Sequence, residues 1–338
     1  MKAYQIGPQT GLESLTLVER PEPVPGPGEV LLAPRLAGLN HRDLLVLSGS
    51  YGARKAEDRV PVSEGVAEVL VTGDGVTNVK VGDRVIFAHF ATWIDGDFVP
   101  SVFAHDVGIT HDGWLAERLC VPAAPLIPVP ASITDEQAAP LASAALTAWN
   151  AVVEVGKVKA GDTVLTLGTG GVSIFALQIA RMNGARVAIT SSSDEKLELA
   201  RKMGAEILVN YRTNPNWEAE VLEKTGGRGA DIVVENGGQA SLPQSLTAAA
   251  PNGRIIVIGA LAGAATAGIP NYNMIIGKNL VIRGIAEGSK AMLQRLLNAV
   301  EVNGIEPVID RVFPFDAAPE AYAYLKSASH VGKVLIRY

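Results

Sequence analysis

The segment that most constrains the fold is 163–173, which reads Thr-Val-Leu-Thr-Leu-Gly-Thr-Gly-Gly-Val-Ser. An apolar, β-prone run ends at a cluster of glycines, and a helical pattern follows from Ile174 to Asn183. Glycines let backbone approach a phosphate, and the first turn of a helix offers unpaired N–H groups to anionic oxygens. The segment therefore predicts a pyrophosphate site for a dinucleotide, with Ser173 in place of the third glycine. An ordinary strand-to-helix turn would show the same local pattern.

The residues after this turn alternate between strand and helix patterns, and this context favours the nucleotide site. Such alternation is typical of a doubly wound parallel sheet with crossover helices, an α/β architecture. We expect strands over 186–190, 207–210, 231–235, 254–258 and 279–283, and helices over 195–203 and 217–224.

The first 120 residues differ, because short strands separated by Gly/Pro turns indicate a β-rich domain. The predicted strands cover 29–37, 66–71 and 83–88, and the segment 90–114 is expected to form a long surface lobe. A proline-rich connection then leads into a helix over 134–155. The chain closes with helices over 290–302 and 319–327 and strands near 308 and over 333–337.

Bulk properties exclude several classes of protein. A length of 338 residues suggests two domains, and 48% hydrophobic residues are ample for a packed core. The single cysteine, Cys120, excludes an internal disulfide and fits a reducing cytoplasm. A net charge of −6 without a basic block argues against nucleic acid, and no apolar run is long enough to predict a membrane span. We expect a cytoplasmic enzyme with a small-molecule substrate.

Short motifs spread over the whole chain resemble the medium-chain dehydrogenase/reductase superfamily, the zinc alcohol dehydrogenases and their quinone oxidoreductase relatives. They include 27–31 (Pro-Gly-Glu-Val-Leu), 38–43 (Gly-Leu-Asn-His-Arg-Asp), 79–85 (Val-Lys-Val-Gly-Asp-Arg-Val), 146–149 (Leu-Thr-Ala-Trp), the glycine turn and 330–334 (His-Val-Gly-Lys-Val). The resemblance implies a GroES-like catalytic domain from residues 1–126 and 286–338, a Rossmann NADP-binding domain from 127–285, and a cleft where they meet. It also implies a homodimer formed through 279–284.

The chain departs from the zinc-dependent members at their metal ligands. It has Asn40 where they carry a catalytic cysteine, Ser63-Glu64-Gly65 where they carry Gly-His-Glu, and Ala144-Ala145 near their second cysteine. The lobe 90–114 lacks the four cysteines of their structural zinc site. His89, His105 and His111 could form another metal site with nearby aspartates, but a solvated polar loop explains them better. We therefore expect no zinc.

The residues after the second predicted strand bear on the choice of cofactor. NAD-binding chains place an acidic residue there for the ribose 2′-hydroxyl. Here Ser191, Ser192 and Ser193 occupy the place, and hydroxyls accept a 2′-phosphate, to which Lys196 could add a charge. Tyr211 and Arg212 could close the adenine side. The sequence favours NADPH, with the alternative that Asp194 or Glu195 binds the ribose and the serines only cap a helix.

The remaining cofactor contacts follow from the resemblance and from the position of loops at strand ends. Thr147 is similar to the threonine that lies near the nicotinamide in the family. The others belong to the glycine turn and to the loops after the fourth and fifth strands: Gly168, Gly170, Gly171, Val172, Asn236, Gly259, Ala260 and Leu261.

Without zinc, the chemistry lacks the Lewis acid that polarises a carbonyl and acidifies an alcohol. Hydride transfer then suits acceptors that are already electrophilic, such as quinones and α,β-unsaturated carbonyl compounds. The Asn…Asp…Gly-x-Tyr spacing of 40–51 is similar to that of zinc-free enoyl and quinone reductases, which makes Tyr51 the candidate proton donor and Asn40 a hydrogen-bonding residue beside the nicotinamide. Tyr51 could equally be a packing aromatic.

We therefore predict an NADPH-dependent, zinc-independent reductase of quinones or activated alkenes. Two alternatives remain: an alcohol dehydrogenase with an unrecognised metal site, and a non-enzymatic NADPH-binding protein with a structural or regulatory role. An apolar substrate cleft could draw on Trp93, Trp114, Tyr272 and Ile285.

Overall fold

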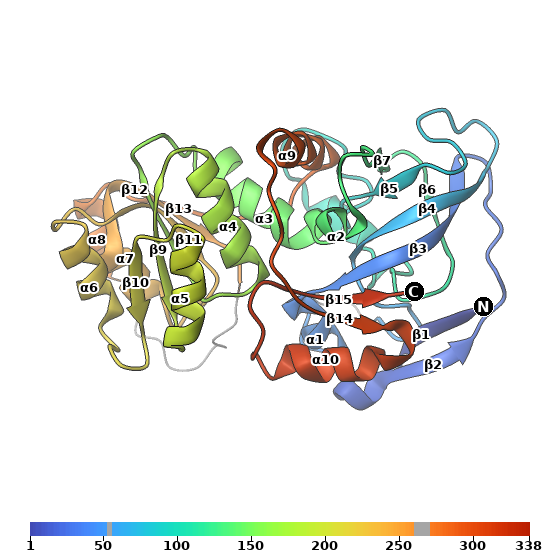
Figure 1. Cartoon of the computed structure of the whole chain (residues 1–338), viewed down its shortest axis with the longest axis horizontal. Coiled ribbons are helices and arrows are strands. Elements are labelled where there is room, and N and C mark those ends of the chain that lie inside the picture. Colours follow the sequence, from blue (N-terminus) through green and yellow to red (C-terminus); the bar gives the residue numbers. More distant parts are fainter. Residues whose placement is uncertain (53–55, 260–270) are drawn as a thin grey trace. The chain divides into compact units, whose positions relative to one another are not determined.

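The computed structural model describes residues 1–52, 56–259 and 271–338 (Figure 1). The chain divides into two compact units. Unit 1 comprises Met1–Leu146 and Gly288–Tyr338, and unit 2 comprises Thr147–Glu287. The first boundary between the two units follows Leu146, later in the chain than the boundary expected after residue 126. Residues 127–146 join unit 1 because Ile127 pairs with Ile86, and the Ser143 N–H is bonded to Glu64.

Unit 1 is built on a seven-stranded sheet in the order β14-β15-β3-β4-β5-β7, with β6 also paired to β3. The strands are β3 (Glu29–Leu39), β4 (Glu64–Thr72), β5 (Arg84–Ile86), β6 (Leu119–Pro122), β7 (Ile127–Pro128), β14 (Ile309–Pro314) and β15 (Lys333–Arg337). A separate hairpin joins β1 (Lys2–Ile6) to β2 (Leu15–Glu19). The sequence did not predict this hairpin.

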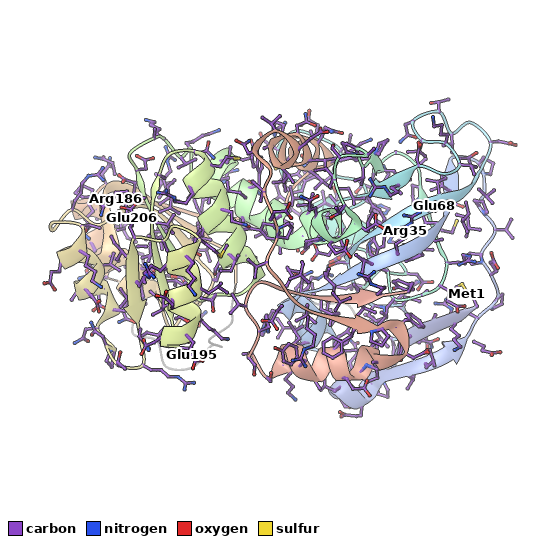
Figure 2. All side chains as sticks on the ribbon, viewed as in Figure 1. Met1, Arg35, Glu68, Arg186, Glu195 and Glu206 are labelled. Carbon is purple, nitrogen blue, oxygen red and sulfur yellow. The ribbon has the colours of Figure 1, made fainter. Side chains whose placement is uncertain are left out.

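The C-terminal strand lies inside this sheet, antiparallel to β3 (Figure 1). Val334 pairs with Leu39, and Gly38 pairs with Glu64 on β4. The start of β15, the end of β3 and the start of β4 therefore share one end of the sheet. An exposed ion pair between Arg35 and Glu68 links β3 to β4 farther along (Figure 2).

Four α-helices complete unit 1 among the described residues: α1 (His41–Leu47), α2 (Asp135–Ala138), α9 (Lys290–Asn303) and α10 (Ala318–Lys326). The segment 90–114 is exposed over 94–101, as predicted for a surface lobe, but both of its ends are buried. Its apolar side chains Phe90, Val107 and Trp114 are buried, and Trp114 stacks on Phe87 with ring centres 5.0 Å apart. Aromatic burial outweighs the polar composition of the segment.

Unit 2 contains a six-stranded, fully parallel sheet in the order β10-β9-β8-β11-β12-β13. Its strands are β8 (Thr163–Leu167), β9 (Arg186–Ser191), β10 (Ile207–Asn210), β11 (Ala230–Glu235), β12 (Ala249–Val257) and β13 (Val281–Gly284). The order reverses between β8 and β11, and open α/β sheets bind ligands beyond the carboxyl ends of the strands at such a point. The predicted doubly wound fold is confirmed.

Helices α4 (Gly171–Met182), α5 (Asp194–Lys202), α6 (Trp217–Lys224), α7 (Leu242–Ala248) and α8 (Tyr272–Gly277) connect these strands. Trp217 and Val221 of α6 pack with Leu246 of α7 against Leu165 and Val209 of the sheet. An exposed ion pair of 3.1 Å joins Arg186, at the start of β9, to Glu206 before β10 (Figure 2).

The predicted helix over 134–155 is a continuous helical stretch, Asp135–Val155, that includes α3 (Leu146–Trp149) and two π-helical turns, Leu141–Ala145 and Asn150–Val155. By length and hydropathy it could cross a membrane, which the sequence expectation did not foresee. However, 83% of its most apolar window is buried inside the protein, as is typical of a core helix.

One residue near the start of β4 has an unfavourable backbone. Val62 has a φ of 77°, although β-branched residues rarely adopt positive φ. Its side chain is buried, and its carbonyl accepts a 2.9 Å hydrogen bond from the N–H of Trp114. The surrounding core therefore holds this residue in a conformation that costs roughly 1–3 kcal/mol.

The backbone at residue 62 predicts an inverted order of stability for two substitutions. Val62→Ala and Val62→Gly both remove the buried side chain, but only glycine relieves the positive φ. We expect Val62→Gly to be more stable than Val62→Ala by about 1 kcal/mol in urea unfolding. Val66 on β4 is the matched control, and there glycine should be the less stable substitution. The same order at both positions would contradict strain at Val62.

Candidate functional site

The glycine turn lies at the carboxyl end of β8, and its backbone is open to a ligand. Gly168 has a φ of 81°, and a Cβ built on Gly168 or Gly170 would meet nothing within 4 Å. Gly170 is the N-cap of α4, and no side chain caps the helix there. The first N–H groups of α4, from Gly171 and Val172 onward, are thus available to an anion.

Ser173, which stands in the place of the third glycine, connects three elements of unit 2. Its hydroxyl donates to the carbonyl of Leu167 at 2.7 Å, and the Asn236 amide donates to the Ser173 oxygen at 2.9 Å. The hydroxyl therefore ties the end of β8 to α4 and to the loop after β11. The departure from the fingerprint is a hydrogen-bonded bridge.

The buried carboxylate of Glu235 organises the loop that carries Asn236. Its Oε1 accepts hydrogen bonds from the N–H groups of Gly237 and Gly238, at 2.8 and 3.0 Å, and from the Ser241 hydroxyl at 2.6 Å. Its Oε2 accepts from the Ser245 hydroxyl. These bonds fix the loop at the end of β11, next to the glycine turn.

The adjacent strand ends complete this edge of the sheet. Gly259 follows β12, and a Cβ at this residue would lie 2.6 Å from the Asn236 carbonyl oxygen, so the two loops approach closely. Val172 is half-buried, and Thr147 is buried on α3. Ala260 and Leu261, also predicted to contact the cofactor, lie outside the described residues.

Ser191, the last residue of β9, is buried, and its hydroxyl accepts a 3.4 Å hydrogen bond from the Ser193 N–H. Ser193 caps α5, and Lys196 lies in the first turn of this helix. The Tyr211 N–H donates to the Ser191 carbonyl at 3.0 Å, which brings Tyr211 beside the serines. Ser192 is half-buried within the same turn.

Asp194 and Glu195, the two acidic alternatives for binding the ribose, differ in their hydrogen bonding. The Asp194 carboxylate accepts a 2.7 Å hydrogen bond from the Asn210 amide at the end of β10. Glu195 is exposed on the first turn of α5 (Figure 2). Asp194 is thus engaged in an exposed contact between α5 and the end of β10.

In unit 1, Asn40 belongs to a buried polar cluster at the shared end of β15, β3 and β4. The Asn40 amide donates to Glu64 Oε1 at 2.8 Å, and its Oδ1 accepts from Lys333 Nζ at 2.7 Å. Lys333 Nζ also donates to Glu64 Oε1 at 2.6 Å, and the Ser143 N–H donates to Glu64 Oε2 at 2.7 Å. Glu64 and Lys333 are 0% and 2% exposed.

Tyr51 lies with a different set of residues. The Arg42 guanidinium lies over its ring, 4.9 Å from the ring centre, and donates to Asp106 Oδ1 at 2.8 Å. Arg42 and Asp106 are buried, whereas Tyr51 is half-buried and packs against the core of unit 1. The cation fixes the plane of the ring. Whether Tyr51 supplies a proton stays a prediction.

The residues of unit 1 do not fit the family's catalytic zinc ion. Asn40 stands where the resemblance places a thiolate ligand, and Ser63-Glu64-Gly65 stand where it places Gly-His-Glu, so neither position offers a cysteine or histidine ligand. The Lys333 ammonium already contacts both Asn40 and Glu64. Zinc prefers thiolate and imidazole ligands, and a cation at this position repels a second one.

The histidines of segment 89–111 are accounted for individually. His89 is buried against Phe90, with ring centres 4.0 Å apart, and the rings of His105 and His111 lie 5.2 Å apart. Among the described residues, no group of three or more His, Cys, Asp or Glu side chains could hold a metal ion. Cys120 is half-buried, and burial beside Glu29 raises its pKa to about 11, so it is a poor nucleophile.

Sequence reasoning missed Lys333, Glu64 and Glu235 as site residues. Each is a charged residue within an otherwise apolar strand pattern, which is a signal of a buried ion pair or network. Of the residues suggested for an apolar cleft, Trp93 and Trp114 are buried, Ile285 is half-buried and Tyr272 is exposed. Their role in a substrate cleft stays a prediction.

Comparison with known proteins gives two family matches. The model of zinc-binding dehydrogenases matches residues 171–301, and the model of the alcohol dehydrogenase GroES-like domain matches residues 26–131. A zinc-type alcohol dehydrogenase-like protein of Schizosaccharomyces pombe is 42% identical over 319 residues, or 92% of this chain and 91% of that protein. The acryloyl-coenzyme A reductase of Sulfurisphaera tokodaii is 29% identical over 100% of both chains.

Solved structures are similar over the whole chain. A structure of an NAD-dependent alcohol dehydrogenase has a TM-score of 0.90 and 34% identity, with 100% of both chains covered. A mycobacterial protein in complex with NADPH has a TM-score of 0.83 and 26% identity, again with 100% of both chains covered.

The buried carboxyl of Asp43 on α1 predicts a pH dependence of stability. Burial raises its pKa to about 6, against the opposing effects of Arg42 and of the hydrogen bond from the Asn40 N–H. The folded protein therefore binds this proton more tightly than the unfolded chain between about pH 4 and 6. Accordingly, the free energy of unfolding falls as pH rises through this window, by at most about 3 kcal/mol.

Urea unfolding from pH 4 to 8 would measure this effect. Asp43→Asn should remove most of the pH dependence of the free energy of unfolding. Asp83→Asn, which alters a partly exposed aspartate in a turn, should leave that pH dependence unchanged. An identical pH profile in Asp43→Asn and in the wild-type protein would contradict the raised pKa.

Proposed function

The chain belongs to the medium-chain dehydrogenase/reductase family of nicotinamide-dependent oxidoreductases, and on that premise we propose that it is a metal-independent, NADPH-dependent reductase. Its proposed substrates are quinones or α,β-unsaturated carbonyl compounds. The proposal rests on one observation in unit 1: the Lys333 ammonium contacts Asn40 and Glu64 at positions where the zinc enzymes of the family bind a metal.

This observation bears on the class of substrate. A zinc ion activates an alcohol by lowering its pKa and activates a carbonyl by accepting a lone pair. An ammonium whose N–H groups are all bonded to protein oxygens does neither. Acceptors with a conjugated double bond need no such activation, and the similarity to an acryloyl-coenzyme A reductase supports this class.

The reaction balances without a metal. When bound, NADPH would supply a hydride to the electrophilic carbon of the acceptor and become NADP⁺. The resulting enolate or phenolate anion then takes one proton, which completes the reduction by two electrons. In this proposal an N–H of Asn40 stabilises the anionic oxygen, and Tyr51 supplies the proton.

The choice of NADPH rests on unit 2. Ser191, Ser192 and Lys196 gather at the end of β9 with Tyr211, and Asp194 is engaged with Asn210. Hydroxyls and an ammonium suit a 2′-phosphate. The similarity to a protein solved with NADPH supports the same choice, whereas the similarity to an NAD-dependent dehydrogenase leaves NADH as the competing cofactor.

We also propose a homodimer formed through β13. This strand ends the sheet of unit 2, and Val281 and Ile282 are 42% and 37% exposed. An exposed apolar edge strand calls for a covering partner. The lone cysteine suits a reducing compartment, and we place the enzyme in the cytoplasm.

A substrate panel with metal analysis tests the function. We expect the purified protein to oxidise NADPH with a quinone, an enal or an acryloyl thioester, at a rate unchanged by 1,10-phenanthroline and without stoichiometric zinc. Absorbance at 340 nm and mass spectrometry of metals are the measurements. The acceptor-free reaction is the control.

Two results would contradict the proposal. Turnover of simple alcohols that phenanthroline abolishes would identify a metal-dependent alcohol dehydrogenase. Tight NADPH binding without reduction of any acceptor would identify a binding protein.

Lys196 provides a separate test of cofactor choice. Removing its charge with Lys196→Met should raise the KM for NADPH about tenfold and leave the KM for NADH unchanged, because only NADPH carries the 2′-phosphate. Lys202→Met, at the other end of α5, is the matched control. A wild-type preference for NADH, or equal effects on both cofactors, would show that Lys196 does not bind the phosphate.

A further inference from the structure

We propose that the buried ammonium of Lys333 is the fixed cation of the unit 1 site: it pairs with the Glu64 carboxylate and holds the Asn40 amide in one orientation. Lys333 is thus a positioning residue for Asn40. The catalytic part of this inference rests on the proposed function, and the structural part does not.

The ammonium is fully satisfied by protein oxygens. Lys333 Nζ donates to the Leu39 carbonyl at 2.6 Å, to Asn40 Oδ1 at 2.7 Å and to Glu64 Oε1 at 2.6 Å. A lysine ammonium has three N–H groups, and each has its acceptor here. The side chain is only 2% exposed, so this charge is held by protein oxygens and not by bulk water.

The carboxylate of Glu64 is equally enclosed. It is 0% exposed and accepts from Lys333, from the Asn40 amide and from the Ser143 N–H. Gly38 makes room for it, because a Cβ at Gly38 would lie 2.8 Å from Glu64 Oε1. A buried carboxylate without its cation is strongly unfavourable, so the two charges require each other.

Together the two charges determine which way the Asn40 amide faces. An ammonium can only donate and a carboxylate can only accept, so Oδ1 must face Lys333 and Nδ2 must face Glu64. A flipped amide would set its N–H groups against the ammonium and its oxygen against the carboxylate. The orientation of the Asn40 amide therefore follows from the charges of its two partners.

This orientation leaves one N–H of Asn40 available to a ligand. The first N–H donates to Glu64 at 2.8 Å, whereas the second reaches the Gly38 carbonyl only at 3.4 Å, a long and weak contact. Asn40 is half-buried, in contrast to its two charged partners. A negatively charged substrate oxygen would compete well for this donor.

A double-mutant cycle on stability tests the structural part. Lys333→Met leaves Glu64 without its cation and should lower Tm by about 10 °C, and Glu64→Gln should also destabilise the protein. Lys333→Met with Glu64→Gln removes both charges and should recover at least half of the loss. Lys278→Met is the control, because Lys278 Nζ donates to three backbone carbonyls in unit 2. The loss of Tm caused by Lys278→Met should add to the loss caused by Glu64→Gln. Additive effects of Lys333→Met and Glu64→Gln would overturn the proposal.

Kinetics of the same variants tests the positioning role. The double variant should lose at least tenfold in kcat while its Kd for NADPH, measured by fluorescence, stays within twofold of the wild-type value. Lys333→Arg retains the cation and should keep most of kcat. A double variant with wild-type kcat, or one that loses NADPH binding in parallel, would overturn the positioning role. If the wild-type protein reduces no acceptor, the proposed function fails, and the stability cycle still decides whether Lys333 is the resident cation.

Discussion

A carboxylate that is shielded from water must find protein partners for its lone pairs, and two such groups organise the candidate site residues of this enzyme. Glu64 and Glu235 are both 0% exposed. Glu64 gathers Asn40, Ser143 and Lys333 in unit 1, and Glu235 gathers the N–H groups and hydroxyls of 237–245 in unit 2. Each carboxylate thereby fixes a loop that carries a candidate site asparagine.

The two asparagines are held by different means. Asn40 lies between opposite charges, which dictate its orientation. Asn236 donates to the Ser173 hydroxyl, which in turn donates to the Leu167 carbonyl, so its position depends on neutral hydrogen bonds across the glycine turn. Ser173, which replaces the third glycine of the dinucleotide fingerprint, therefore couples the glycine turn to the neighbouring loop. Its hydrogen bonds restrain the backbone of the turn.

Local patterns predicted the parts of the fold that depend on local physics. The strand Ile207–Asn210 and the helix Trp217–Lys224 match their predicted bounds, and the parallel sheet places Gly168, Ser191 and Asn236 at one edge, as the strand order requires. Contacts between distant segments were not predictable in this way. Lys333 lies 293 residues from Asn40, and only the pairing of β15 with β3 brings them together. The burial of Trp114 likewise depends on Phe87 and on the core around it.

Under the proposed function, an ammonium in place of a metal ion limits what unit 1 can do for a substrate. A metal ion with an open coordination position accepts a lone pair from the substrate. The three N–H groups of the Lys333 ammonium already donate hydrogen bonds to protein oxygens. With Glu64 beside it, the pair carries no net charge, so its role is to orient Asn40 and not to draw electrons from a carbonyl. Under the proposed function, the substrate must therefore already contain an electrophilic carbon. The protein then supplies hydrogen bonds to the anion that forms after hydride transfer. Similarity to the alcohol dehydrogenases then extends to the fold and the nicotinamide cofactor, and it ends at the activation of an alcohol.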